Sequence, residues 1–100
     1  EMEINPAGVD RLEEEPQIFS LTPGQYGGSL SWFASPKPDR FHTDALMADD
    51  AAWVLKRCAE RKDRPFFLAV GFFRPHTPYV APKDAYYGYY PESEMPVVQG

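Results

Sequence analysis

The sequence of 100 residues contains a single cysteine, Cys58, so no disulfide can form within the chain. No apolar run approaches the roughly 20 residues that a membrane-spanning helix needs. The N-terminal residues, EMEINPAGVD, have neither the basic start nor the apolar core of a signal peptide. The sequence therefore predicts no internal disulfide and no membrane span, and it leaves the cellular compartment open.

Positive charge is also scarce. Ten Lys and Arg residues face fifteen Asp and Glu residues, which gives a formal net charge of −5. This balance argues against nucleic acid or an anionic membrane surface as a partner, because both attract basic proteins. The basic residues between positions 56 and 64 alternate with Glu60 and Asp63, a pattern typical of the solvated end of a helix.

Proline and glycine are abundant, with 11 and 7 residues respectively. The proline content exceeds average usage, and both residue types interrupt helices and strands. Most of the strong apolar signal falls in residues 45–73, and residues 1–40 have little periodic pattern. A chain of this kind has difficulty closing a core by itself. We therefore expect it to be an internal segment of a larger domain.

Residues 1–40 are predicted to be loop-rich, because breakers such as Asn5-Pro6 and Thr22-Pro23-Gly24 recur there. Two short stretches, residues 17–21 and 29–34, alternate partly between apolar and polar side chains and predict a short β-ribbon. The sequence thus divides into a loop-rich region at 1–40 and a helix–strand–loop segment at 41–100.

Residues 43–62 are predicted to form an amphipathic helix. Thr43 or Asp44 can act as N-cap. The apolar face has helical spacing and consists of Met47, Ala51, Val54, Leu55 and Cys58. Acidic residues lie early and basic residues late, which complements the helix dipole. The Arg64-Pro65 pair ends the helix, because the residue before proline avoids helical angles.

The apolar run at residues 66–73 is predicted to be a strand buried on both faces, of the kind found inside a parallel sheet. The chain offers no other strand of similar hydrophobicity. A short helix is predicted at residues 81–87, with Pro82 in its first turn. The fold class is therefore α/β, and the chain supplies one amphipathic helix, one buried strand and a short C-terminal helix.

Polar side chains follow directly after this predicted strand, where open α/β sheets place their chemistry. His76 lies between Pro75 and Pro78 and can donate a hydrogen bond to an anion or move a proton near neutral pH. The alternative is a loop histidine bonded to a nearby carbonyl. Arg74 suits carboxylate, sulfate or phosphate oxygens. Its alternative is a structural ion pair with Asp84 or another acid.

Several other polar residues are weaker candidates. Thr77 and Tyr79 can add hydroxyl contacts, although Tyr79 is better explained by packing at the rim. His42 is expected to be solvent-exposed at the start of the helix, and Asp49-Asp50 to lie on a solvated helix face. Cys58 is expected to be a small buried filler. Four tyrosines lie close together near the end of the chain: Tyr86, Tyr87, Tyr89 and Tyr90. They are expected either to line a sugar-binding cleft or to pack against the rest of the domain.

Two runs in the second half resemble sulfatases related to iduronate-2-sulfatase. The run RPFFLAVGFFRPHTPYVAPKDAYYGYYP resembles the middle of these enzymes, and FHTDALMADDAAWVLKRCAE resembles the helix that precedes it. The resemblance covers residues 41–98, and its most specific part is the pattern G-F-x-[K/R]-P-H-x-P-[F/Y]. Arg74 stands where the iduronate enzyme has lysine, so the resemblance does not extend to substrate specificity.

The resemblance implies an alkaline-phosphatase-like α/β fold with a large mixed sheet. It implies hydrolysis of a sulfate ester, such as a sulfated sugar, by a formylglycine beside a calcium ion in a periplasmic, extracellular or lysosomal enzyme. It assigns His76 to the sulfate group near the leaving oxygen, and Arg74 to the substrate's sugar or acid group.

The resemblance also shows what this chain does not contribute. Cys58 is followed by Ala59-Glu60-Arg61 and not by x-P-S-R, so it is not the formylglycine precursor. The family's metal ligands and catalytic lysines have no counterpart here either. The chain alone is therefore expected to be inactive and to depend on the remainder of the sulfatase domain.

Two other functions fit the sequence. The first is a phosphodiesterase or phosphonate hydrolase built on the same scaffold. The second is a non-catalytic domain that binds carbohydrate or a protein through its tyrosine-rich end, and this function requires the chain to fold stably by itself.

Overall fold

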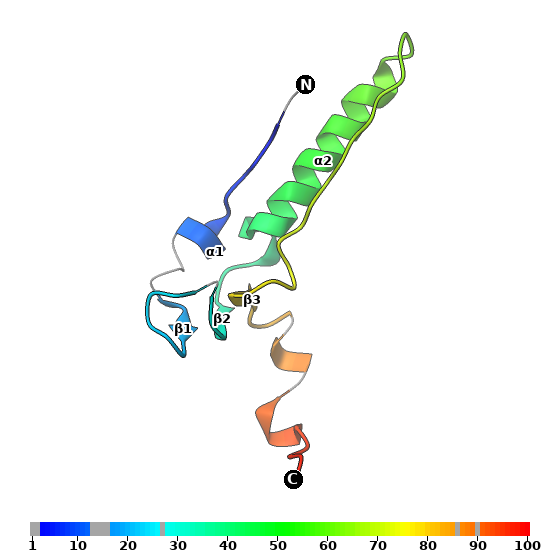
Figure 1. The fold of residues 1–100 in the computed structure, drawn as a ribbon. Coiled ribbons are helices and arrows are strands. Elements are labelled where there is room, and N and C mark those ends of the chain that lie inside the picture. The colour runs from blue at the N-terminus through cyan, green and yellow to red at the C-terminus, as the bar shows by residue number, and fades with distance from the viewer. Residues whose placement is uncertain (1–2, 13–16, 27, 86, 90) are drawn as a thin grey trace.

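The computed structural model describes residues 3–12, 17–26, 28–85, 87–89 and 91–100. These residues form two α-helices, three strands and three short 3-10 turns, arranged as in Figure 1. The elements are α1 (Val9–Leu12), β1 (Phe19–Ser20), β2 (Ser31–Ser35), η2 (Asp39–Phe41), α2 (Thr43–Glu60), β3 (Tyr79–Pro82), η3 (Tyr87–Tyr89) and η4 (Glu92–Glu94). This mixture of helix and mixed sheet is consistent with a piece of an α/β protein.

A small sheet with the order β1-β2-β3 lies at the base of the long helix (Figure 1). β1 pairs antiparallel with β2 and places Phe19 opposite Trp32, whose ring centroids are 4.5 Å apart. Such cross-strand aromatic pairs stabilise a short ribbon. β1 lies within the predicted stretch 17–21, and β2 overlaps the predicted stretch 29–34 and extends one residue beyond it, to Ser35.

β3 lies where the sequence predicts the start of a short helix, and that prediction is wrong. Ala81 and Pro82 instead pair in parallel with Ala34 and Ser35 of β2. The Lys83 N–H extends this pairing by donating to the Ser35 carbonyl at 2.8 Å. Proline is tolerated here because it stands at the end of an edge strand. The pairing joins segments more than 40 residues apart, which local propensity does not encode.

Helix α2 forms within the predicted range. It begins at Thr43, with His42 as N-cap in place of the predicted Thr43 or Asp44, and it ends at Glu60. The Arg61 N–H closes the last turn by donating to the Cys58 carbonyl at 3.1 Å. The predicted apolar face is only partly covered, because Met47, Ala51 and Val54 are half-buried while Leu55 is 46% exposed.

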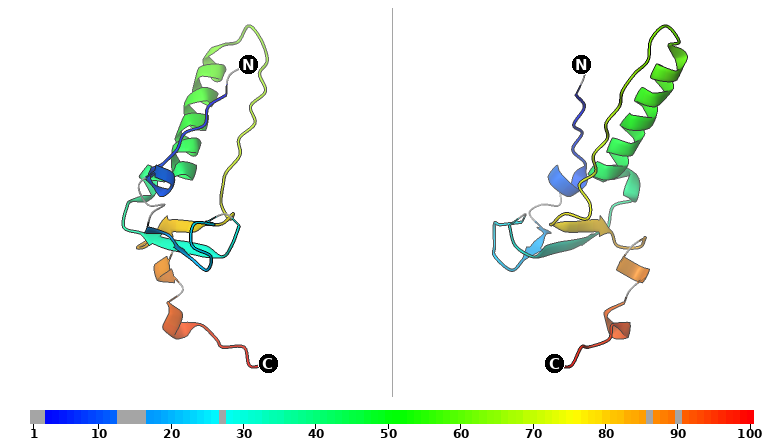
Figure 2. Two further views of the ribbon diagram at one scale, coloured as in Figure 1. Left: turned by 60° about the vertical axis from the view of Figure 1, so that its left-hand side comes forward. Right: turned by 45° about the vertical axis from the view of Figure 1, so that its right-hand side comes forward.

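Residues 66–73 do not form the buried strand that their hydrophobicity predicts. They run as extended chain from the far end of α2 back to its start and pair with no strand in the described part of the chain (Figures 1 and 2). Phe67 is 93% exposed, and Phe66 and Phe72 are more than half exposed. A strand of this composition is stable only between neighbouring strands. The exposed run therefore agrees with the expectation that this segment belongs to a larger sheet.

The described residues do not enclose one large core. Among them, Ile18 and Val80 are the buried apolar residues. The radius of gyration is 17.5 Å, compared with about 13 Å for a compact domain of 100 residues. The chain extends 61 Å along its longest axis and 28 Å along its shortest. None of the described helices has the length and apolar character needed to cross a bilayer.

We expect the isolated 100-residue chain to be marginally stable, because residues 66–73 expose a row of large apolar side chains. Thermal unfolding followed by circular dichroism is predicted to be broad, and a hydrophobic dye such as ANS is predicted to bind. Replacing Phe67 by Ser should weaken dye binding. A cooperative melt with well-dispersed amide NMR signals would contradict this prediction and favour a domain that folds alone.

Candidate functional site

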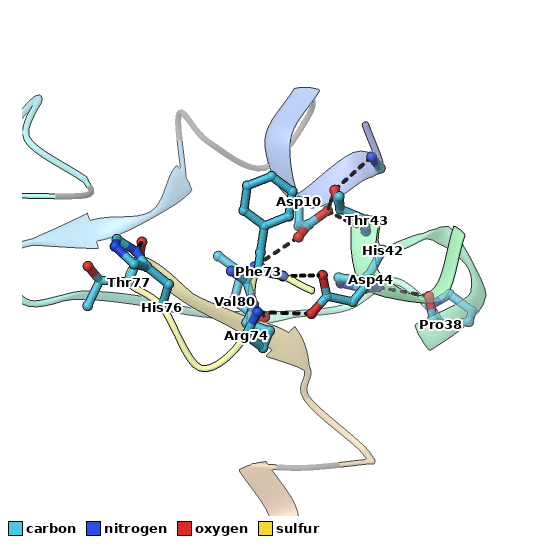
Figure 3. Close-up of polar contacts among 11 residues, drawn as sticks. Asp10, Pro38, His42, Thr43, Asp44, Phe73, Arg74, His76, Thr77 and Val80 are labelled. Atoms are coloured by element: carbon cyan, nitrogen blue, oxygen red, sulfur yellow. Dashed lines mark hydrogen bonds and ion pairs between the residues drawn. The ribbon is translucent and has the colours of Figure 1, made fainter. Parts of the chain in front are cut away.

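Three of the four residues predicted to carry chemistry, Arg74, His76 and Thr77, lie in the Pro-His loop, defined here as residues 74–78, between the exposed run and β3. The fourth, Tyr79, is the first residue of β3. The helix start fixes the beginning of this loop. The Asp44 carboxylate accepts the backbone N–H groups of Phe73 at 2.8 Å and of Arg74 at 3.0 Å (Figure 3). Hydrogen bonds to a charged acceptor are stronger than neutral ones. Asp44 therefore ties the Pro-His loop to the first turn of α2.

The Arg74 side chain fixes the same loop from its other side. Its Nε donates to the Val80 carbonyl in β3 at 2.9 Å. Its terminal nitrogen lies 2.8 Å from Oδ2 of Asp10 in α1. The Arg74 side chain is 30% exposed and that of Asp10 is 4% exposed, so the ion pair is mostly shielded from water. Among the acids, Asp10 and not Asp84 is the partner in this structure.

Asp10 connects α1 to the start of α2. Its Oδ1 accepts the Thr43 backbone N–H at 2.9 Å and the Thr43 hydroxyl at 2.7 Å. The same Thr43 hydroxyl accepts the Gly8 N–H at 2.8 Å. A Cβ added at Gly8 would lie 2.4 Å from the Thr43 nitrogen, so the backbones approach too closely for a side chain there. Both carboxylate oxygens of Asp10 thus accept from donors of other segments.

His76 lies in the middle of the Pro-His loop and is exposed. Its Nδ1 is 2.6 Å from the Thr77 carbonyl (Figure 3). Because a carbonyl only accepts, this contact requires the proton on Nδ1. Nε2 makes no hydrogen bond with the described residues and is the ring atom left to meet a ligand. The carbonyl contact considered as an alternative role for His76 is present, and it orients the ring.

A cavity of about 340 Å³ adjoins His76. It brings together residues from α1, the exposed run and the Pro-His loop: Asp10, Arg11, Phe73, Arg74, His76, Thr77 and Pro78. Three of the four predicted site residues, Arg74, His76 and Thr77, therefore share one cavity. The fourth, Tyr79, lines a neighbouring cavity of about 400 Å³ together with Arg74, His42 and Asp44.

One histidine is buried although the sequence predicts that it is exposed. His42 is only 5% exposed, and its Nδ1 is 3.0 Å from the Pro38 carbonyl. Pro38, directly before the η2 turn, thus supplies a hydrogen-bond acceptor for the buried imidazole. Asp49 is exposed as predicted, whereas Asp50 is half-buried. Cys58, predicted to be buried, is only half-buried on α2. Tyr89 is 74% exposed, while Tyr86, Tyr90 and the side chain of Tyr87 lie outside the described residues.

Sequence reasoning also missed residues that build the site. Asp10 and Arg11 lie more than 60 residues before the Pro-His loop, in a region without a recognisable pattern, and no local signal identifies them. Asp44 was recognised as a candidate N-cap, but its carboxylate accepts N–H groups from another segment. Within the described ranges, no group of three or more His, Cys, Asp or Glu side chains could hold a metal ion.

Comparison with known proteins adds one similarity. The chain is 44% identical over 63 residues to a curated protein named sulfatase from Formosa agariphila. The match covers 60% of this chain and 11% of that protein, so the chain spans about a tenth of its relative's length. No family model matches the chain, and no solved structure matches it. The similarity supports the sulfatase family for this segment.

We predict that Asp10→Asn lowers the unfolding free energy of the full-length protein by about 1–3 kcal/mol, because the partly buried Arg74 loses its counter-ion. Chemical denaturation measures this loss. Asp49→Asn is the matched control, since Asp49 is exposed on α2 and should change stability by less than about 0.5 kcal/mol. Equal stability of the two variants would contradict a structural role for the ion pair.

Proposed function

We propose that this chain is a central segment of a sulfatase and that it supplies one wall of the pocket that binds a sulfate ester. The observation that carries the proposal is the 44% identity to a sulfatase over 63 residues. A second observation supports it. His76 lines a cavity together with Arg11 and Thr77, whose side chains carry donors suited to an oxyanion, and with Arg74, which is paired with Asp10.

In this proposal His76 contacts the sulfate group through Nε2. Its Nδ1 is committed to the Thr77 carbonyl, which fixes the orientation of the ring. Because the Nδ1 proton is engaged by the Thr77 carbonyl, Nε2 carries a proton only in the imidazolium form of His76. In that form Nε2 would donate toward the ester oxygen and stabilise the negative charge that develops as the sulfur–oxygen bond breaks. Thr77 lines the same cavity and adds a hydroxyl, whereas Tyr79 adds its hydroxyl at the neighbouring cavity.

Arg74 has a different role in the proposed pocket from the one that the family resemblance implies. Its guanidinium is bonded to the Asp10 carboxylate and to the Val80 carbonyl. The charge of Arg74 is therefore compensated within the protein. We propose that Arg74 is a positioning residue that holds the Pro-His loop, and that any contact with the substrate's sugar is secondary.

The fold and the cofactors of the complete enzyme belong to the same proposal. Residues 66–73 would add a strand to the mixed sheet of an alkaline-phosphatase-like domain, and that sheet would cover their exposed side chains. In the complete enzyme a calcium ion would supply positive charge beside the sulfate group, and a formylglycine would supply the nucleophile. Among the described residues no group of side chains forms a ligand set that fits a metal, and Cys58 lies in the wrong sequence context for a formylglycine.

The substrate that we propose is a sulfated carbohydrate, as in sulfatases related to iduronate-2-sulfatase. The remainder of the sulfatase domain is the partner that completes the site. Exposed apolar side chains at residues 66–73 support such a partner, because they leave a large apolar surface open to a neighbouring part of the domain.

Replacing His76 by Ala in the full-length protein is predicted to reduce turnover of an aryl sulfate by about 100-fold or more, because a positioned donor to the reacting group is lost. The variant should fold normally, since His76 is exposed. Sulfate release measures turnover, and circular dichroism measures folding. Undiminished sulfate release from His76→Ala would remove the catalytic assignment.

Sulfate and phosphate esters of one chromogenic alcohol are predicted to differ as substrates of the full-length protein. The sulfate ester should be hydrolysed faster, because the proposed pocket stabilises a sulfate oxyanion. The ratio of kcat/KM for the two esters is the measurement. Activity on the phosphate ester alone would overturn the sulfatase proposal in favour of a related phosphoester hydrolase.

A further inference from the structure

Two arginines line the cavity beside His76. Arg74 is paired with a carboxylate, whereas Arg11 has no carboxylate partner among the described residues. Arg74 faces the Asp10 carboxylate at 2.8 Å, so this pair contributes almost no net charge to the cavity. Arg11 lines the same cavity and forms no ion pair with a carboxylate among the described residues. Among the described residues that line this cavity, the positive charge without a carboxylate partner therefore belongs to Arg11.

Arg11 is also held in place. Its backbone N–H donates to the Gly8 carbonyl at 3.0 Å in the single turn of α1. Its guanidinium carbon lies 4.8 Å from the centroid of the Phe73 ring. Phe73 is itself anchored, because its N–H donates to the Asp44 carboxylate at 2.8 Å. A ring attracts the flat face of a guanidinium and leaves the N–H groups at its edge available for an anion.

From these contacts we infer that Arg11 is a substrate-binding residue that, together with His76, contacts the sulfate group of the ester. This inference rests on the proposed function. Arg11 lies outside every motif of the second half of the chain, and the fold brings it to the Pro-His loop from more than 60 residues away. Its planar fork of N–H donors matches two oxygens of a sulfate group.

The chain offers a matched control for Arg11. The guanidinium carbon of Arg40 lies 4.7 Å from the Phe41 ring centroid, nearly the same distance as the 4.8 Å between Arg11 and Phe73. Arg40 is exposed and does not line the His76 cavity. Arg40→Gln therefore removes the same charge from the same kind of stack at a different place.

The first experiment measures binding of inorganic sulfate to the full-length protein by isothermal titration calorimetry. Arg11→Gln is expected to raise the Kd for sulfate about ten-fold, because a bidentate, charge-assisted contact is lost. Arg40→Gln is expected to change the Kd by less than about two-fold, since exposed charges at a distance are screened by salt. Arg11→Lys keeps the charge without the fork and should fall between wild type and Arg11→Gln.

The second experiment measures hydrolysis of an aryl sulfate by the same variants. Loss of binding shared by ground state and transition state raises KM and leaves kcat within about two-fold. We expect this pattern for Arg11→Gln, in contrast to the loss of kcat expected for His76→Ala. Circular dichroism before each assay verifies that the variants are folded.

The outcomes distinguish the inference from the proposed function. The inference would be overturned if Arg11→Gln left the Kd for sulfate unchanged, or if Arg40→Gln raised it equally. A wild-type enzyme that releases sulfate would still support the proposed function in either case. A wild-type protein that hydrolyses no sulfate ester would contradict the proposed function. If such a protein still bound sulfate and lost that binding in Arg11→Gln alone, the result would support Arg11 as an anion-binding residue without turnover.

Discussion

The ion pair between Asp10 and Arg74 is the interaction on which the arrangement of this site depends. It joins α1 to the Pro-His loop across 64 residues of sequence, at a distance of 2.8 Å. Asp10 also accepts two hydrogen bonds from Thr43, so one buried carboxylate connects three segments. A mostly desolvated carboxylate must be fully bonded to be tolerated. The need to satisfy Asp10 therefore fixes where α1, α2 and the Pro-His loop meet.

The charged residues around the cavity have different roles in this arrangement. Asp10 neutralises Arg74, and Asp44 accepts N–H groups from the backbone next to it. These contacts hold the Pro-His loop in place, so the position of His76 depends on Asp10, Arg74 and Asp44, of which Asp10 and Arg74 also line the cavity. The remaining cation, Arg11, is placed by the same contacts because it stacks on Phe73. In the proposed site, positioning would thus fall to Arg74 and ligand binding to Arg11, two arginines of one cavity.

The exposed run at residues 66–73 is the clearest difference between what the sequence encodes and what the structure contains. Its hydrophobicity specifies a strand buried on both faces, but Phe67 is 93% exposed and no ladder forms among the described residues. The free energy of a buried strand comes from its neighbours, which hydrogen-bond its edges and cover its side chains. The segment adopts extended backbone without them, and its side chains remain in water.

The sequence by itself determined the features that depend on local pattern: helix α2, the β1–β2 ribbon, and the Pro-His motif with its resemblance to sulfatases. Residues close in the chain specify these features through helical spacing, alternation and proline placement. Only the tertiary structure decided the burial of His42, the parallel pairing of β3 with β2, and the meeting of Asp10 and Arg11 with Arg74 and His76. These contacts join distant segments, and their free energy arises from ion pairing, desolvation and strand pairing that no local pattern records.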